Sequence, residues 1–374
     1  MTAPQEYKST GQARFQEYIQ KIATGPRQSK DLSKEEAYDA MMLILNGEIS
    51  SVRSAIFLIA IRMKRETLEE NMGIWKALDA TTQKHHVKVE KLLQVAEPFD
   101  GFNRTPCFGF YSIPVLAQLG LPCYGHSSLT LPPKHGVTFQ EILQHHYNIS
   151  HTTPMDLDHL EQRGFCYIGL HQSHPKLETL RKLREEMVKR SALATFEKML
   201  MPLSAQQGTN VLATTYFHKG YEVPMIAVAK LSKFEKTIFG NGLESTTLFG
   251  VHKTTPLFSV CLNKETGAQI VEKKTIEIGS SLDKKDAERV QAAYMELKAE
   301  KTAIGSLTNL GEQALKNGSG PASPLISWQA GSLAYLSGSI ASSREGFQAA
   351  EEILKKGVAY SRLMAYIERG LKVC

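Results

Sequence analysis

Cysteine is scarce in this sequence of 374 residues. The five cysteines are an odd number, stand far apart and include no Cys-x-x-Cys pair. This pattern gives no indication of a zinc site or of a redox-active pair, and a reducing compartment is its simplest setting. The cysteines are Cys107, Cys123, Cys166, Cys261 and Cys374.

Long apolar runs are also missing. The longest, residues 55–61, is far shorter than the ~20 residues that a membrane-spanning helix needs. Residues 1–8 lack the apolar core of a secretion signal, and no internal repeat or low-complexity tail is present. We therefore expect a soluble, cytoplasmic protein with no membrane partner.

Neither sign of charge is in large excess. Lys and Arg outnumber Asp and Glu by 44 to 38, a formal charge of +6. This balance is compatible with anionic small ligands or with weak nucleic-acid affinity, and it does not choose between them. Hydrophobic residues are abundant, at 42 %, so the chain can fill two domains or one large one.

Short helices are the clearest pattern in the first 80 residues. Two capping boxes, an Asn-Gly stop and apolar positions spaced by three and four mark them. The expected helices are 12–24, one from Ser33 to Asn46-Gly47, one from Ser50 or Ser51, and one from Thr67 to about Leu78. We place a domain boundary near residues 82–92.

Beyond that boundary, β-rich runs alternate with helical ones, as is typical of a parallel sheet with crossover helices. The expected strands are 122–124, 165–170, 210–217 and 236–240, with β-rich stretches at 246–262 and 273–278. The expected helices are 111–119, 138–146, a long charged one at 176–198, 225–234, 283–298, and a final set near 325–338, 343–356 and 358–370.

Residues 30–78 carry a helix cap, an Asn-Gly-Glu link, an apolar helix and an Arg-x-Lys-x-Glu-Thr run. In that order they resemble the amino-terminal helical domain of the anthranilate phosphoribosyltransferase family, and residues 333–359 resemble its last helices. The resemblance implies an α/β fold, also that of type II nucleoside phosphorylases. The implied fold has a helical domain of residues 1–85, joined by about 176–200, and a larger domain of residues 86–175 and 201–374 with a mostly parallel sheet. It also implies a homodimer packed through the helical domains.

Active members of this family join anthranilate to the ribose of phosphoribosyl pyrophosphate, with magnesium. Their phosphate loop, Gly-Thr-Gly-Gly-Asp-Gly, corresponds here to residues 96–101, where only Asp100 and Gly101 remain. Glu97 would place a carboxylate near the pyrophosphate, Pro98 lacks an amide donor and Phe99 adds bulk. The resemblance thus implies a phosphoribosyltransferase-like protein for which the anthranilate reaction is doubtful.

Other family motifs survive in part on the phosphate side. His126 keeps the imidazole of a Lys-His-Gly-Asn motif, and Lys134 and Gly136 stand where the family has Lys-Ser-Gly. A lysine beside a helix start can bind an anion, although an ordinary loop-to-helix junction looks the same. Arg104 would face phosphate, or would lie over the helix that follows it.

The acceptor and metal motifs are also incomplete. Arg184 and Arg190 keep the outer arginines of the acceptor run, and His174 falls where the family has His-Pro, although a solvated helix face also explains the arginines. Glu244 keeps one of two magnesium-binding carboxylates and alone would bind Mg²⁺ weakly; a surface loop is the other interpretation. Histidine clusters, including His151, lack the ligand spacing of zinc sites.

Two hypotheses follow. In the first, the chain is a phosphoribosyltransferase that takes a phosphorylated sugar or another small anion. In the second, residues 99–106 place it in a divergent branch of the superfamily, some of whose members bind nucleic acid without turnover, chiefly through phosphate contacts.

Overall fold

The structure is a computed structural model that describes residues 10–25, 27–104, 108–150, 154–263, 265–298 and 303–373. Cys107, Cys374, His151 and the first eight residues lie outside these ranges. In the part that is described, Cys123, Cys166 and Cys261 are free thiols. No described helix is both long and apolar enough to cross a bilayer.

A bundle of helices opens the chain, as the capping patterns predict. Its members are α1 (Gly11–Ile22), α2 (Lys34–Leu45), α3 (Ser51–Lys64) and α4 (Leu68–Thr81). At α2 the Ser33 hydroxyl accepts from the Glu36 amide, and the Glu36 carboxylate accepts from the Ser33 amide. Thr67 and Glu70 make the same reciprocal pair at α4, so both predicted capping boxes are confirmed.

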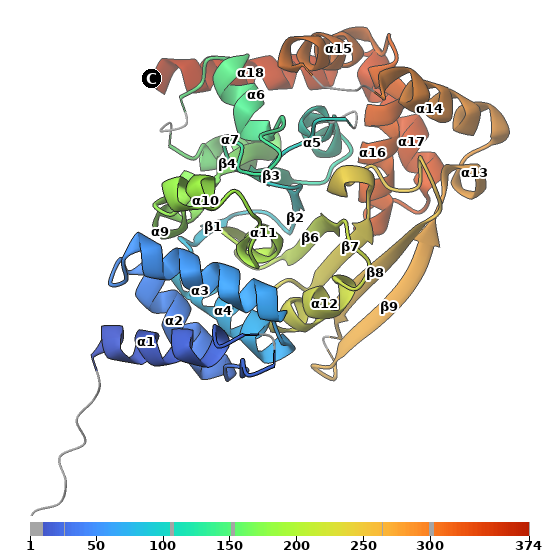
Figure 1. The fold of residues 1–374 in the computed structure, drawn as a ribbon. Helices are drawn as coiled ribbons and strands as arrows, with labels where there is room; N and C mark the ends of the chain where they lie inside the picture. Colours follow the sequence, from blue (N-terminus) through green and yellow to red (C-terminus); the bar gives the residue numbers. More distant parts are fainter. Residues whose placement is uncertain are drawn as a thin grey trace, which may run out of the picture.

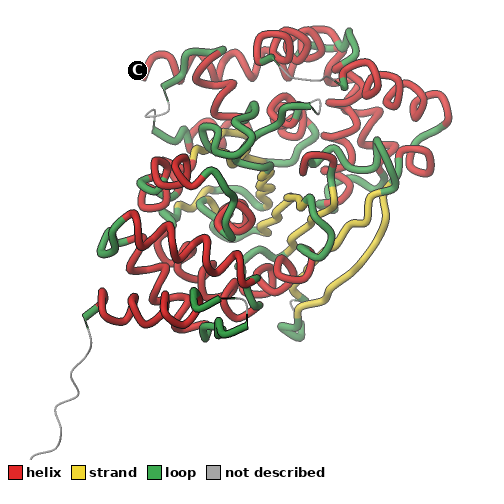
Figure 2. Tube along the Cα trace, in the orientation of Figure 1, coloured by secondary structure: helices red, strands yellow, loops and turns green. Residues whose placement is uncertain are grey.

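The larger part of the chain is built on one mixed sheet (Figures 1 and 2). Among the described residues its seven strands run in the order β4-β3-β2-β6-β7-β8-β9, parallel from β4 to β7 and antiparallel at β8 and β9. The strands are β2 (Lys91–Ala96), β3 (Cys123–Ser127), β4 (Phe165–Gly169), β6 (Thr209–Tyr216), β7 (Lys236–Asn241), β8 (Thr255–Leu262) and β9 (Gln269–Ile276). The expected mostly parallel sheet is confirmed.

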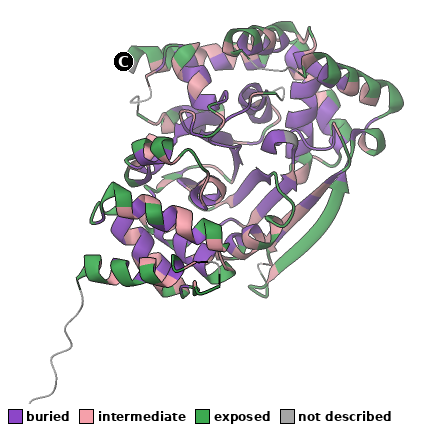
Figure 3. Cartoon of the chain, viewed as in Figure 1, coloured by how far each residue is buried: buried purple, intermediate pink, exposed green. Residues whose placement is uncertain are grey.

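Helices cover both faces of this sheet. The later ones, α14 (Lys284–Leu297), α15 (Ile304–Asn317), α16 (Ala322–Leu336), α17 (Ser343–Lys355) and α18 (Val358–Val373), share one apolar core with α5 (Gly109–Gln118). The bundle and α12 (Glu222–Leu231) share a second core with the other face, which includes Leu212 and Phe239. Figure 3 shows the buried sheet between them and the exposed outer strand β9.

Short elements complete the described chain. They are a parallel pair, β1 (His85–Val87) with β5 (Leu203–Ala205), and the helices α6 (Phe139–His145), α7 (Leu157–Arg163), α8 (Leu170–Ser173), α9 (Pro175–Glu178), α10 (Arg181–Met187), α11 (Leu193–Phe196), η1 (Glu197–Met199), η2 (Leu243–Ser245) and α13 (Ile278–Ser281).

The expected long helix over 176–198 is wrong. The chain there forms α9, α10, α11 and η1, because Val188 takes a left-handed conformation (φ 59°) and ends α10. Leu183, Leu193 and Phe196 of this segment are buried in the core of the helical bundle. Helix α15, which the sequence pattern did not indicate, is a second difference. The exact domain limits stay a prediction.

Candidate functional site

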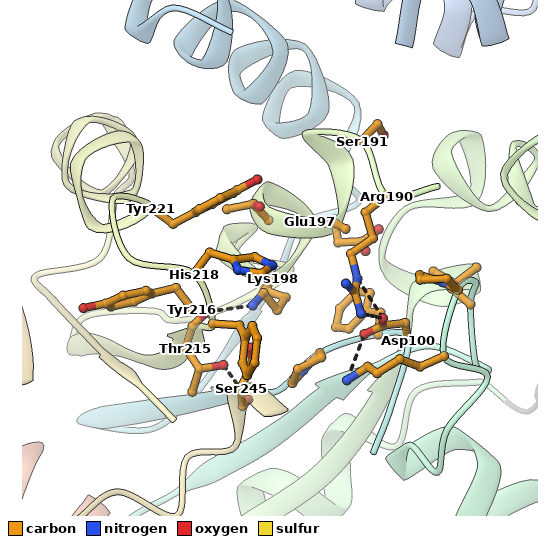
Figure 4. A pocket seen from close by; sticks show the side chains of 18 of the residues that line it. Asp100, Arg190, Ser191, Glu197, Lys198, Thr215, Tyr216, His218, Tyr221 and Ser245 are labelled. Carbon is orange, nitrogen blue, oxygen red and sulfur yellow. Dashed lines mark hydrogen bonds and ion pairs between the residues drawn. The ribbon is translucent and has the colours of Figure 1, made fainter. Parts of the chain in front are cut away.

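A cavity of about 410 Å³ lies where the helical bundle faces the carboxyl ends of the parallel strands. Its walls come from the loops after β2, β3, β6 and β7, together with α3 and residues 184–198. The carboxyl edge of an open parallel sheet is where such folds bind ligands. The cavity, seen from close by in Figure 4, is therefore the candidate site.

Asp100 holds two of the predicted cations in this cavity. Its buried carboxylate accepts from Arg190, with Nε to Oδ2 at 2.8 Å and a second guanidinium contact, and it lies 3.4 Å from the Lys134 ammonium. The Lys134 ammonium also makes a cation–π contact with Phe102, with its Nζ 5.4 Å from the ring centroid. Thus the structure brings Asp100, Lys134 and Arg190 together, and the single carboxylate offsets one of the two positive charges.

Gly101 and Gly136 lie behind this cluster, where the loops after β2 and β3 cross. Gly101 has φ +73°, and a Cβ on it would come within 2.3 Å of the Gly136 carbonyl oxygen. Phe102 and Val137 exchange backbone hydrogen bonds of 3.0 and 2.9 Å beside the crossing. These glycines permit the close approach of two backbones, and neither lines the cavity.

Glu244 lines the cavity but already accepts hydrogen bonds from the loop after β2. Its carboxylate takes the Arg104 amide at 2.8 Å and the Asn103 amide at 3.4 Å, so the exposed Arg104 side chain stands at the cavity wall. No group of at least three His, Cys, Asp or Glu residues that could hold a metal ion occurs among the described residues. The residues present do not by themselves fit a magnesium site, and the assignment of Mg²⁺ to Glu244 stays a prediction.

Arg184 and Glu197 form a buried ion pair in the cavity wall. The guanidinium donates twice to the carboxylate, at 2.6 and 2.9 Å, and the two side chains are 9 % and 1 % exposed. Such a bidentate pair satisfies both charges. Arg184, one of the two arginines retained from the acceptor run, is thus engaged inside the protein.

Lys198 is a functional candidate that the sequence interpretation missed. The residue is 4 % exposed, lines the cavity, and its ammonium donates to the Thr215 carbonyl oxygen at 2.7 Å. Burial lowers the pKa of Lys198 to about 8, against the attraction of Asp100 and Glu197. The sequence could have pointed to this residue, because Lys198 is the single charge in the run Lys-Met-Leu-Met-Pro-Leu, and a lone charge in an apolar run is a candidate for burial.

Aromatic side chains form the opposite wall, after β6. The rings of His218 and Tyr221 lie with centroids 6.2 Å apart, and both line the cavity beside Lys198 (Figure 4). Phe217 and Tyr221 are 51 % and 42 % exposed. The sequence could have indicated this aromatic wall through the run Tyr-Phe-His-Lys-Gly-Tyr at residues 216–221.

Neither of the predicted histidines lines the cavity. His126 is fully buried between Gln94 and Ser173, and burial lowers its pKa to about 3. His174 caps α9 by accepting the Leu177 amide, while its other ring nitrogen lies 3.0 Å from the Leu78 carbonyl oxygen. Burial lowers the pKa of His174 to about 4, so both rings are neutral groups of the core.

Glu97 does not face the cavity, which corrects the expectation that it would lie near a pyrophosphate. Its buried carboxylate accepts from the Thr246 hydroxyl and from both the amide and the hydroxyl of Thr247, at 2.8 to 3.1 Å, and from Gln329 at 3.3 Å. Phe99 lines the cavity, but its ring is almost fully buried and packs against His126, with the centroids 5.2 Å apart. The changed loop therefore builds part of the core.

Comparison with known proteins gives consistent results. Residues 16–82 match the helical bundle domain of the glycosyl transferase family. An anthranilate phosphoribosyltransferase of Methanobrevibacter smithii is 24 % identical over 355 residues, which cover 95 % of this chain and 98 % of that protein. An uncharacterized protein of Aquifex aeolicus is 31 % identical over 219 residues, 58 % of this chain and 64 % of that protein.

Solved anthranilate phosphoribosyltransferases share the fold. The enzyme of Thermus thermophilus superposes with a TM-score of 0.70 at 20 % identity, over 96 % of this chain and 99 % of its own. That of Saccharomyces cerevisiae, in complex with PRPP and Mg, gives 0.72 at 15 % identity, over 96 % and 98 %. This chain therefore shares its fold with both solved enzymes over nearly the whole length of each.

Proposed function

We propose that the chain, whose residues 16–82 match the helical bundle domain of the glycosyl transferase family and whose fold is shared by anthranilate phosphoribosyltransferases, binds a phosphorylated sugar in the cavity. The sugar would be of the phosphoribosyl pyrophosphate type, and its phosphoribosyl group would pass to an acceptor other than anthranilate.

The cluster of cations at the carboxyl edge of the sheet is the observation that carries this proposal. Lys134, Arg190 and Lys198 line one cavity, with Arg104 at its wall. Phosphate groups are bound by such side chains through charge-assisted hydrogen bonds. Because Glu97, Phe99 and the glycine crossing occupy the loop after β2, side chains rather than an amide cradle would supply these bonds.

The buried ion pair argues against anthranilate as the acceptor. A benzoate carboxylate that binds at Arg184, as the acceptor run of the family implies, would have to displace Glu197, which accepts two hydrogen bonds from this guanidinium. Breaking that pair would leave a buried, unpaired carboxylate, which costs about 3–5 kcal/mol. A different acceptor avoids this cost.

Calorimetry with phosphoribosyl pyrophosphate, with and without magnesium, tests the proposal. Binding is expected for the wild type and is expected to weaken about tenfold in Arg104→Ala and in Lys134→Ala, since each removes one charged contact. Arg344→Ala, on α17 and outside the cavity lining, is the charge-matched control. No heat at millimolar sugar, or equal losses in all variants, would overturn the proposal.

Nucleic-acid binding is the second candidate function. It is favoured by the exposed Phe217 and Tyr221, which stand in one cavity lining with Arg62 and Arg104. Aromatic rings beside cations suit single strands, on which bases stack. A labelled oligonucleotide should then bind with an affinity that falls steeply with salt, and the absence of binding at low salt would remove this candidate.

A homodimer through the helical bundle completes the proposal. Val52, Ile56 and Met63 on α3 are 70 %, 44 % and 75 % exposed. They lie along one helix and are not buried by any part of the chain that the structure describes, as expected of side chains that a second copy covers.

A further inference from the structure

Lys198 carries its positive charge deep in the cavity wall. Its ammonium makes one hydrogen bond, to the Thr215 carbonyl oxygen, and forms no ion pair within the described part of the chain. Asp100 and Glu197 act on it only by Coulomb attraction at longer range. An ammonium group has three donors, and a buried charge is costly unless another charge pairs with it.

Three other cations of the cavity differ from Lys198 because each has a carboxylate partner. Asp100 pairs with Lys134 and Arg190, and Glu197 pairs with Arg184. A ligand would have to displace a carboxylate from any of these three, whereas at Lys198 it would add a counter-ion. Arg62 and Arg104 also line the cavity without an ion pair in the described part of the chain, but they are exposed rather than buried. Lys198 is therefore the cation best placed to receive the most buried negative charge of a ligand.

Two flat rings adjoin this position. His218 and Tyr221 project toward the cavity on the side of Lys198 away from Asp100 (Figure 4). Their centroids are 6.2 Å apart, and Tyr221 keeps 42 % of its surface exposed. Faces of this kind stack on flat, conjugated rings.

From the buried ammonium and the two rings we propose that the cavity contains a subsite for a phosphate monoester joined to a flat heteroaromatic ring. The phosphate lies on Lys198 and the ring lies against His218 and Tyr221. Nucleoside monophosphates are the simplest ligands of this class. A cavity of about 410 Å³ is within the range of small-molecule sites, ~300–1,000 Å³.

This inference rests on the proposed ligand-binding role of the cavity but requires no turnover. Calorimetric titration of the full chain with AMP, adenosine and ribose 5-phosphate separates its two parts. AMP is expected to bind at least about tenfold more tightly than adenosine, which lacks the phosphate, and than ribose 5-phosphate, which lacks the ring.

Matched variants assign the two parts to residues. Lys198→Met should weaken AMP and ribose 5-phosphate about 10- to 100-fold and leave adenosine unchanged. Its control is Lys236→Met, because Lys236 also donates to a backbone carbonyl, that of Leu336, at 2.7 Å, but lies outside the cavity lining. The control should bind all three ligands as the wild type does.

Tyr221→Ala should weaken AMP and adenosine about fivefold or more and leave ribose 5-phosphate unchanged. Tyr335→Ala is its control, since Tyr335 has nearly the same exposure, 41 %, and does not line the cavity.

Three results would overturn the inference: adenosine binding as tightly as AMP, Lys198→Met binding AMP like its control, or Tyr221→Ala weakening ribose 5-phosphate as much as AMP. If phosphoribosyl pyrophosphate binds and AMP does not, the inference fails and the proposed function stands. If AMP binds in the expected pattern and phosphoribosyl pyrophosphate does not, the proposed function fails and the inference stands.

Discussion

Replacing Lys198 by methionine should stabilise the protein at neutral pH. The fall of the Lys198 pKa from 10.5 to about 8 corresponds to a cost of about 3 kcal/mol for the protonated form in the folded chain, since each tenfold change in proton affinity is worth about 1.4 kcal/mol. Methionine has a similar length and no charge. Loss of the bond to Thr215 offsets about 1 kcal/mol, so the free energy of unfolding should rise by about 2 kcal/mol.

The stability gained by Lys198→Met should decrease as the pH rises. Between pH 8 and 10.5 the unfolded chain holds the Lys198 proton and the folded chain does not, so the wild type gains stability as the pH rises. The groups that act on Lys198, which are Asp100, Glu197, Lys134 and Arg190, remain in the variant. The advantage of Lys198→Met is therefore full below pH 8 and shrinks by about 2 kcal/mol at about pH 9.5.

Urea unfolding followed by circular dichroism at about pH 7 and about pH 9.5 measures both quantities. Lys236→Met, which removes a similar bond to a backbone carbonyl, should show no gain at either pH. The reasoning is refuted if Lys198→Met is less stable than the wild type at pH 7, or if its gain is the same at both pH values.

Further predictions concern the other charges and the apolar face of α3. Glu197→Gln should lower the free energy of unfolding by about 3–5 kcal/mol because it leaves Arg184 buried without a counter-charge, and the double change to methionine at both positions should restore most of it in urea titrations. Asp100→Asn should tighten the binding of pyrophosphate about tenfold in calorimetry, since its two cationic partners lose their internal counter-ion; unchanged affinity would show that these cations do not bind the ligand. Val52→Asp should convert a dimer to a monomer in light scattering, and an unchanged mass would place the interface elsewhere or exclude it.

The helical bundle could be predicted because its signals are local. A capping box joins residues three positions apart, so Ser33 and Glu36 reveal a helix start without knowledge of the fold. The prediction of one long helix over residues 176–198 was wrong because the conformation of this segment depends on contacts that are distant in the sequence. Their charges suggest one exposed helix, but Leu183 and Phe196 are buried by elements far away in the chain, and tertiary packing overrides local propensity.

In the cavity, too, the sequence indicated some individual residues but not the distant partners that hold them. Resemblance to family motifs pointed to Lys134 and Arg190, which do stand together, yet their joint partner Asp100 is 34 and 90 residues away. Lys198 escaped notice because its partner is the backbone of Thr215, and a carbonyl oxygen leaves no trace in the sequence.

The loop after β2 explains how one segment can lose a phosphate cradle without loss of order. Glu97 buries a carboxylate that would repel an anion if it faced the cavity, and hydrogen bonds from Thr246, Thr247 and Gln329 satisfy that carboxylate. Phe99 lines the cavity, but its ring is almost fully buried and packs against His126. The amides of Gly101, Phe102, Asn103 and Arg104 are committed to the fold, so we expect anion affinity to come chiefly from side chains such as Lys134, Arg190 and Lys198. The side chains of Lys134 and Arg190 are 18 % and 39 % exposed, and they are therefore more strongly screened by salt than a buried amide cradle. Binding by this chain should therefore weaken more steeply with added salt than binding by a relative that keeps the glycine loop, and titrations of both proteins in a salt series decide whether the site has changed in this way.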